Sequence, residues 1–232
     1  MWKKIITDKY RIATYVAILF HVVGLAGILW IDAAVFASLT SLNMLVMLAL
    51  ICWTQEQKNA AFYFFALICY AVGFLTEAAG VRSGLLFGNY SYGDALGFKM
   101  KNVPLLIGVN WFIVIYCCGT AMNLLQQKIR SRLAPEAFAS FTWWSRVSIV
   151  IDGALLAVLF DWIMEPAAVA LGFWQWEDGI IPVLNYITWF AVSVLLLVVF
   201  SLLGFNKANV FAVHLLLIQF MFFLVLRTFL PA

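Results

Sequence analysis

The chain has 232 residues, of which 66% are apolar and only 11% are charged. A soluble domain of this size carries about a quarter charged residues, so the composition excludes an ordinary soluble protein and indicates an integral membrane protein in a lipid bilayer. The net charge of +3 is small and is distributed between apolar segments, which argues against a nucleic-acid partner. The four cysteines all lie within apolar segments and are expected to be core residues rather than disulfides.

Seven segments are apolar and long enough, at about 20 residues, to cross a bilayer as helices. We expect these spans at about 12–30, 33–53, 60–80, 103–125, 147–165, 181–204 and 209–229. The chain is therefore predicted to be an all-α, single polytopic membrane domain over 1–232. Ten Lys and Arg residues fall on one side of this topology and four on the other, so the positive-inside rule places the N-terminus in the cytoplasm and the C-terminus outside.

Two aromatic, glycine-rich loops, 81–102 and 166–180, face the same outer side in this topology. The sequence around the first reads "TEAAGVRSGLLFGNYSYGDALGFKMKNVPLLIGVNWF", and around the second "MEPAAVALGFWQWEDGIIPVLNYITWF". Both have, in order, a glutamate at a helix end, an aromatic-x-aromatic pair, a proline, an asparagine and a Trp-Phe pair. The shared order predicts a parallel repeat of two helical hairpins, helices 3–4 and 5–6, at about 60–125 and 147–204. In such a repeat a cavity is expected between the hairpins.

The carboxylates near these loops are the strongest candidates for chemistry, because an acid within a bilayer is costly unless it is paired or functional. Asp161 and Glu165 are four residues apart and therefore share a helix face. Two neighbouring carboxylates in a low-dielectric place are expected to keep a proton at neutral pH, as a general acid requires. Glu77 is the counterpart of Glu165 in the first copy. The alternative is that Glu165 is merely water-exposed before Pro166 and that Asp161 bonds an amide or hydroxyl.

Other polar residues are expected to be structural. Asp152 is out of phase with Asp161 and is expected to pair with Arg146, while Glu177 and Asp178 are expected to be solvated turn residues. His21 and His214 are more typical of hydrogen-bonded contacts within a bundle than of metal ligands. The sequence contains no recognisable metal or phosphate-loop motif.

This combination of acids and aromatic rings suits a long apolar substrate dissolved in the bilayer. A carboxylic acid could protonate a trisubstituted alkene, and aromatic faces would stabilise the resulting cation. Water would then capture the cation. Without water the cation would cyclise or lose a proton, so hydration, cyclisation and isomerisation all stay open on this evidence.

The segments "FGNYSYGDALG…VPLLIGVNWFIVIY" and "DWIMEPAAVALGFWQWEDG…IPVLNYITWF" resemble the signature regions of the membrane carotenoid-biosynthesis proteins. That family includes bacterial lycopene and γ-carotene hydratases and archaeal bisanhydrobacterioruberin hydratases. The resemblance covers about 75–195 and implies a bacterial or archaeal cell membrane, an acyclic carotenoid substrate and addition of water to its terminal double bond. It also implies catalysis without a metal or redox cofactor.

Matched residue by residue, the family's acid element falls on Asp161, Glu165 and Pro166, and its earlier glutamate on Glu77. The resemblance thus implies catalytic roles for Asp161, Glu165 and Glu77. The substrate-binding residues we expect are Tyr90, Tyr92, Asn110, Trp111, Trp174, Trp176, Asn185 and Trp189. In one departure, the family often has aspartate where this chain has Glu165.

The order of acid, glycine-aromatic pair and proline is also similar, more distantly, to the heterodimeric-type membrane lycopene cyclases. Cyclisation or isomerisation on the same scaffold is therefore the first alternative. The second is a non-catalytic carotenoid- or lipid-binding protein, or a transporter with an acidic proton relay. The oligomeric state stays open.

Overall fold

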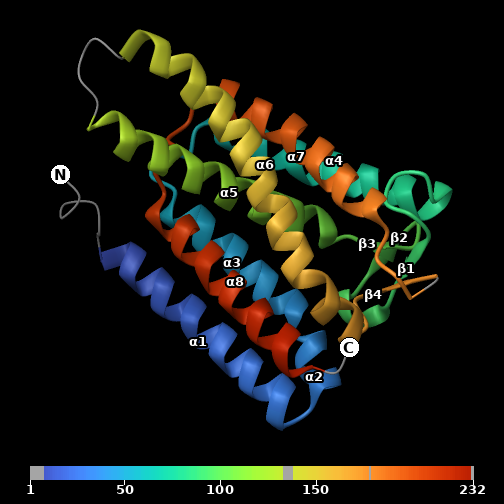
Figure 1. Ribbon diagram of the computed structural model, residues 1–232. Helices are drawn as coiled ribbons and strands as arrows, with labels where there is room; N and C mark the ends of the chain where they lie inside the picture. The colour runs from blue at the N-terminus through green and yellow to red at the C-terminus, as the bar shows by residue number, and fades with distance from the viewer. Residues whose placement is uncertain (1–7, 133–137, 178, 231–232) are drawn as a thin grey trace.

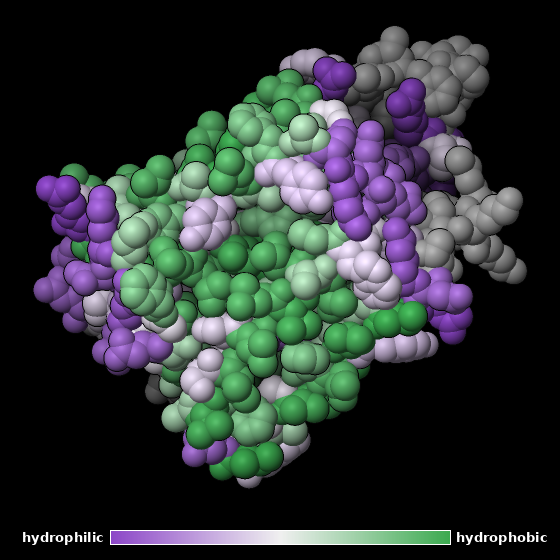
Figure 2. Space-filling view, turned by 180° about the vertical axis from the view of Figure 1, so that it is seen from behind, coloured by the Kyte–Doolittle hydropathy of each residue, from purple (hydrophilic) through white to green (hydrophobic). Residues whose placement is uncertain are grey.

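The computed structural model in Figure 1 describes residues 8–132, 138–177 and 179–230, with backbone alone for 138–142. Within this part of the chain, seven helices are long and apolar enough to cross a membrane, as the sequence predicts. These spans are Asp8–Trp30, Ala33–Thr54, Ala60–Ser83, Ile107–Arg130, Trp143–Ala170, Val183–Leu202 and Val210–Phe229. Hydrophilic residues gather at the two ends of the molecule and leave a broad apolar band between them (Figure 2), as expected of a bilayer-spanning bundle.

The helices in chain order are α1 (Asp8–Trp30), α2 (Ala33–Ser38), α3 (Thr40–Thr54), α4 (Ala60–Ser83), α5 (Ile107–Arg130), α6 (Phe138–Ala170), α7 (Val183–Leu202) and α8 (Val210–Phe229). Helices α2 and α3 together form the second span. Asparagines begin two of the helices: the side chain of Asn59 accepts from the backbone N–H of Phe62, and that of Asn209 from Phe211. Gly84 ends α4 with a left-handed backbone (φ 67°) that suits glycine.

Helix α5 forms the centre of the bundle. Its residues from Ile107 to Thr120 are buried almost without interruption, because α4, α6, α7, α8 and α3 all pack against it. A helix that is apolar on every side is expected at such a central position. Helix α1 packs on α8 at the edge of the bundle, and α6 packs on α5, α7 and α8.

Four short strands lie together at one end of the bundle: β1 (Tyr90–Tyr92), β2 (Lys99–Met100), β3 (Val103–Pro104) and β4 (Trp174–Trp176). Strand β2 pairs with the adjacent β3, whereas β1 pairs with β4, which is far away in sequence. The two loops therefore lie at the same end of the molecule, as expected. The side of the membrane that they face and the hairpin repeat both stay predictions.

The end of α6 differs from the expected boundary, because the helix passes through Pro166 and continues to Ala170. A proline has no N–H, so the carbonyl of Trp162, four residues earlier, loses its usual helical partner. The guanidinium of Arg227 on α8 replaces that partner with a hydrogen bond of 2.5 Å to the Trp162 carbonyl, and it lies 4.0 Å from the centre of the Trp162 ring. Glu165 is consequently held inside a helix rather than at its end.

The second difference concerns Asp152, which forms no ion pair with Arg146 in the described part of the chain. The Asp152 carboxylate instead accepts a hydrogen bond from Ser148, one turn earlier on the same helix. The expected structural role of Asp152 holds, but its partner is a hydroxyl. The histidines are structural contacts: His21 bonds the Ala17 carbonyl and His214 bonds Thr14. Glu177 is exposed, and Asp178 lies outside the described residues.

Candidate functional site

Strands β1 and β4 join the two aromatic loops into one antiparallel ladder. Tyr90 lies opposite Trp176, and Tyr92 lies opposite Trp174. Because side chains alternate along a strand, these four aromatic rings point to the same face, while the residues between them, Ser91 and Gln175, are exposed. Each aromatic-x-aromatic pair thus contributes both of its rings to a single aromatic cover over the end of the bundle.

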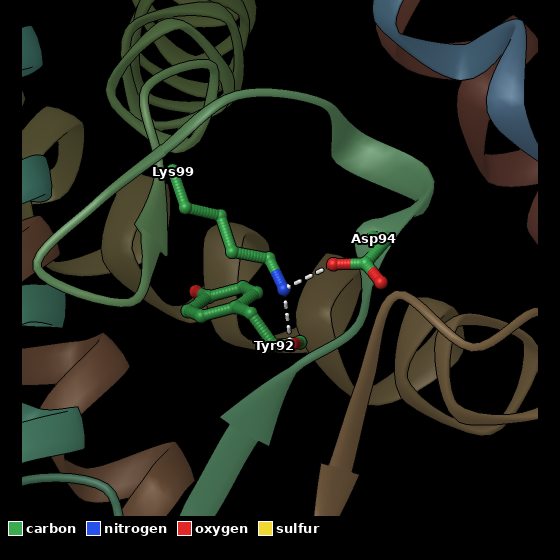
Figure 3. A network of polar contacts seen from close by, with 3 residues as sticks. All are labelled: Tyr92, Asp94 and Lys99. Atoms are coloured by element: carbon green, nitrogen blue, oxygen red, sulfur yellow. Dashed lines mark hydrogen bonds and ion pairs between the residues drawn. The ribbon is translucent and has the colours of Figure 1, made fainter.

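The loop after β1 is fixed by a close backbone approach and by one lysine. The N–H of Gly93 donates to the Phe173 carbonyl at 2.9 Å, and a Cβ at Gly93 would lie only 2.0 Å from the Gly172 carbonyl oxygen. Lys99 Nζ donates to the Tyr92 carbonyl at 2.8 Å and to Asp94 at 2.7 Å (Figure 3). The backbone of Tyr92 is therefore held from both sides.

Glu77 on α4 is 4% exposed and accepts hydrogen bonds on both carboxylate oxygens. Its Oε2 accepts from the hydroxyls of Tyr90 and Tyr92, and its Oε1 accepts from Trp111 Nε1 at 3.0 Å. Burial first, and then the adjacent Glu77, raise the pKa of the Tyr90 and Tyr92 hydroxyls above the usual range, so both stay protonated as donors. Glu77 is thus the centre of a cluster of aromatic donors.

Glu165 on α6 is surrounded in a similar way. Its Oε2 accepts from the indole N–H groups of Trp174, at 3.0 Å, and Trp176, at 3.1 Å, while its Oε1 accepts from Asn185 Nδ2 at 3.3 Å. An indole nitrogen can only donate, so two of the three partners cannot accept a proton from Glu165. This environment is suited to a carboxylate rather than to a carboxylic acid.

Asp161 differs from both glutamates. It is 0% exposed, its Oδ2 accepts from Asn185 Nδ2 at 2.7 Å, and its Oδ1 has no hydrogen-bond partner among the described residues. A buried carboxylate oxygen without a donor is costly, whereas a protonated one can present its O–H to a ligand. Asp161 is therefore the acid best placed to carry a proton.

The three acids line one small cavity between the helices and the aromatic cover. Its volume is about 20 Å³, enough for about one water molecule. Of the eleven residues expected from the sequence, ten line this cavity: Glu77, Tyr90, Tyr92, Asn110, Asp161, Glu165, Trp174, Trp176, Asn185 and Trp189. We refer to it as the carboxylate cavity.

Trp111, the eleventh, lies behind the cavity wall. Its ring stacks on that of Trp189 with 4.1 Å between ring centres and 19° between ring planes, while its N–H bonds Glu77. The Trp-Phe pairs of the two loop-helix segments thus meet face to face through their tryptophans. Asn110 lines the cavity, but its side chain forms no hydrogen bond with any described residue.

Sequence reasoning missed three residues of the site. Phe87 and Ile107 complete the cavity wall, and both are ordinary apolar residues whose sequence carries no distinguishing signal. Arg227 supports Glu165 from α8 through the Trp162 carbonyl. The signal for Arg227 was present, since a proline four residues after a helical carbonyl leaves that carbonyl in need of a donor. No group of three or more His, Cys, Asp or Glu within the described ranges is arranged to hold a metal ion.

Comparison with known proteins decides the family. A model of the family described as "carotenoid biosynthesis protein" matches residues 13–231. The chain belongs to the carotenoid biosynthesis protein family. It is also similar to the bisanhydrobacterioruberin hydratase of Haloarcula japonica, with 27% identity over 156 residues, which cover 66% of this chain and 48% of the relative. This carotenoid biosynthesis protein thus spans about half the length of that curated relative, and no solved structure matches it.

Proposed function

We propose that this protein adds water across the terminal double bond of an acyclic carotenoid. Family membership supports a carotenoid substrate, and the similarity to a hydratase supports hydration. The observation that carries the proposal is the carboxylate cavity. It combines a fully buried acid, one oxygen of which has no partner among the described residues, with two fully bonded glutamates and room for about one water.

In the proposed reaction Asp161 is the proton donor. Its O–H adds a proton to the less substituted carbon of the terminal double bond, so that a C–H bond forms, the π bond breaks and a tertiary cation remains. The water in the cavity then forms a C–O bond to that cation. The proton that the water loses returns to the Asp161 carboxylate, so the acid is restored and the net change is the addition of one water.

Glu77 and Glu165 are proposed to stabilise the cation rather than to transfer the proton. Each accepts hydrogen bonds from N–H or O–H donors on both oxygens, which favours its charged form, and both line the cavity that would hold the water. The faces of the surrounding tyrosine and tryptophan rings add cation–π stabilisation. A charge arrangement that is already in place has no reorganisation cost during the reaction.

The direct test is expression in a host that accumulates lycopene, followed by pigment separation and mass spectrometry. A product heavier than lycopene by one or two waters, with an intact acyclic polyene spectrum, is the expected result. A ring-bearing product of unchanged mass would show that the protein cyclises lycopene rather than hydrating it. Unchanged lycopene, with the protein inserted in the membrane, would contradict catalysis on this substrate.

A further inference from the structure

An apolar cavity at the lipid-facing surface lies between α1 and α3. This lateral cavity has a volume of about 290 Å³. Several of its lining side chains are also exposed at the bundle surface, among them Leu19 and Val23 of α1 and Leu42 of α3. Exposed apolar side chains in the membrane band contact lipid tails, so a molecule dissolved in the bilayer can reach this cavity without crossing water.

A second cavity of about 60 Å³ lies between the lateral cavity and the carboxylate cavity. This middle cavity shares Thr40, Asn43 and Phe222 with the lateral cavity. On its other side it shares Asn110 and Trp174 with the carboxylate cavity. The three cavities are therefore consecutive, and the wall between the last two contains the side chain of Asn110, which has no partner among the described residues.

The middle cavity contains two buried acceptors that the described residues leave unpaired. They are Oε1 of Gln219 on α8 and Oδ1 of Asn43 on α3. Gln219 is only 9% exposed. A buried acceptor without a donor is destabilising, so both oxygens favour an occupant that brings a hydrogen-bond donor with it. Most of the other lining residues, including Met164 and Phe223, are apolar, and the polar ones are His21, Thr40 and Asn110.

The volumes of the cavities determine which part of a long substrate each cavity can hold. The carboxylate cavity has room for about one water and none for the branched end of an isoprenoid chain. The chain end must therefore lie in the middle cavity, against the wall of Asn110 and Trp174 that borders the carboxylate cavity. The rest of the chain then extends through the lateral cavity into the bilayer.

We propose that the lateral and middle cavities are the binding site for an acyclic isoprenoid chain, which enters from the bilayer between α1 and α3 with its reacting end inward. A neutral hydroxyl, either on the chain or as an accompanying water, bonds Gln219 and Asn43. This inference rests on the proposed function for the identity of the chain, but the binding site is tested without turnover.

The test measures binding of lycopene to the full chain carrying Asp161→Asn, reconstituted in phosphatidylcholine vesicles, by quenching of tryptophan fluorescence. A second substitution in this chain, Gly24→Leu, fills the lateral cavity. A Cβ at Gly24 would lie 3.7 Å from Phe222, an ordinary contact, so the backbone accommodates the change. Val23→Phe is a second filling variant at a 50% exposed position. Both are expected to weaken binding at least tenfold while the thermal unfolding temperature stays unchanged.

Leu217→Phe is the matched control. Leu217 lines a different lipid-facing groove, between α1 and α8, which borders the middle cavity at His21 and Phe222 and is therefore the competing route from the bilayer. The control is expected to bind lycopene like the parent. Weaker binding in Leu217→Phe together with normal binding in Gly24→Leu would overturn the route, and so would normal binding in both filling variants. If the chain with Asp161 intact binds lycopene by this route but gives no hydrated product, the proposed function alone is contradicted.

Gln219→Leu distinguishes the two sources of the donor. The affinity of this variant is measured for lycopene and for an acyclic carotenoid that carries a tertiary hydroxyl. If the hydroxyl belongs to the chain, Gln219→Leu weakens binding of the hydroxylated probe several-fold and leaves lycopene unaffected. If a water accompanies the chain, both probes change together. Unchanged binding of both probes would overturn the role of Gln219.

Discussion

Asn185 donates from one nitrogen to two acids, to Asp161 at 2.7 Å and to Glu165 at 3.3 Å. An amide of α7 thus sets the relative positions of two carboxylates that are one turn apart on α6. The asymmetry between these acids comes from their remaining oxygens, because Glu165 is bonded by two indoles and Asp161 Oδ1 has no partner among the described residues.

The first prediction separates these two acids. Asp161→Asn is expected to lower the hydration rate by 10²-fold to 10⁴-fold or more, because the amide cannot supply the acid proton. Glu165→Gln is expected to retain measurable turnover with a smaller loss, since it removes a charge and not the donor. Product formation in membranes with equal protein content measures both. Full activity in Asp161→Asn would contradict the assignment of the acid.

The second prediction concerns the donors to Glu77. Tyr90→Phe and Tyr92→Phe each remove one hydroxyl bond to Glu77 and leave the ring in place. Each is expected to destabilise the fold by about 1.5–3 kcal/mol, the usual magnitude for a hydrogen bond to a charged group. Thermal unfolding in detergent measures this, with Tyr63→Phe, whose ring is 54% exposed, as the matched control. Equal unfolding temperatures for all three variants would show that the hydroxyl bonds to Glu77 contribute nothing.

The third prediction tests the close contact beneath the aromatic cover. Gly93→Ala places a Cβ 2.0 Å from the Gly172 carbonyl oxygen, so β1 and β4 must separate. Loss of both activity and about 1–3 kcal/mol of stability is expected. Gly204→Ala is the control, because nothing lies within 4 Å of the Cβ it would add. If the two variants behave alike, the approach of the loops does not matter for the site.

The fourth prediction concerns Arg227 and the proline in α6. Arg227→Met should destabilise the helix around Glu165 by about 1–3 kcal/mol, because the Trp162 carbonyl loses its donor. In the background of Pro166→Ala, which restores a backbone N–H to that carbonyl, the same change should cost much less. A double-mutant cycle of unfolding free energies measures this coupling. Additive effects would mean that Arg227 acts independently of the proline.

The fifth prediction is a pH dependence at the loop surface. Lys99 lowers the pKa of Asp94 below its ordinary value of 3.8, so the pair stabilises the folded loop above that pH and this contribution is lost as the pH falls through the lowered value. Asp94 is fully exposed, so Asp94→Asn should change little at pH 7. Lys99→Met, which also removes the bond to the Tyr92 carbonyl, should lower activity more. If Asp94→Asn lowers activity more than Lys99→Met does, the ion pair with Asp94 matters more for the site than the bond to the Tyr92 carbonyl.

Much of the architecture follows from composition and spacing. Apolar length alone predicts the seven spans, since nothing else satisfies backbone groups in a bilayer. The placement of Glu77 and Glu165 at one cavity was expected from the matching order of features in the two loops, and that of Asp161 from the helix face it shares with Glu165. The pairing of β1 with β4 was not expected. Three-residue strands such as Tyr-Ser-Tyr and Trp-Gln-Trp are too short for their alternating pattern to be recognised as a strand.

The roles of the individual acids could not be assigned from sequence either. Asp161 and Glu165 share a helix face. Only their contacts show that Glu165 accepts hydrogen bonds on both oxygens, whereas one oxygen of Asp161 has no donor among the described residues. The helix boundary at Pro166 was misplaced for a related reason: the compensating donor, Arg227, is 61 residues away in sequence. Long-range partners of this kind are determined by packing and leave no local pattern.

The carboxylate cavity lies at one end of the bundle, beneath the strands and near the ends of α4 and α6. Any chemistry there is confined to a single leaflet of the membrane. A rigid chain long enough to extend through both leaflets can present only one of its tips to this depth at a time. Under the proposed function, conversion of the second tip therefore requires the pigment to leave, reverse its direction in the bilayer and bind again, so singly converted pigment should accumulate before the doubly converted form.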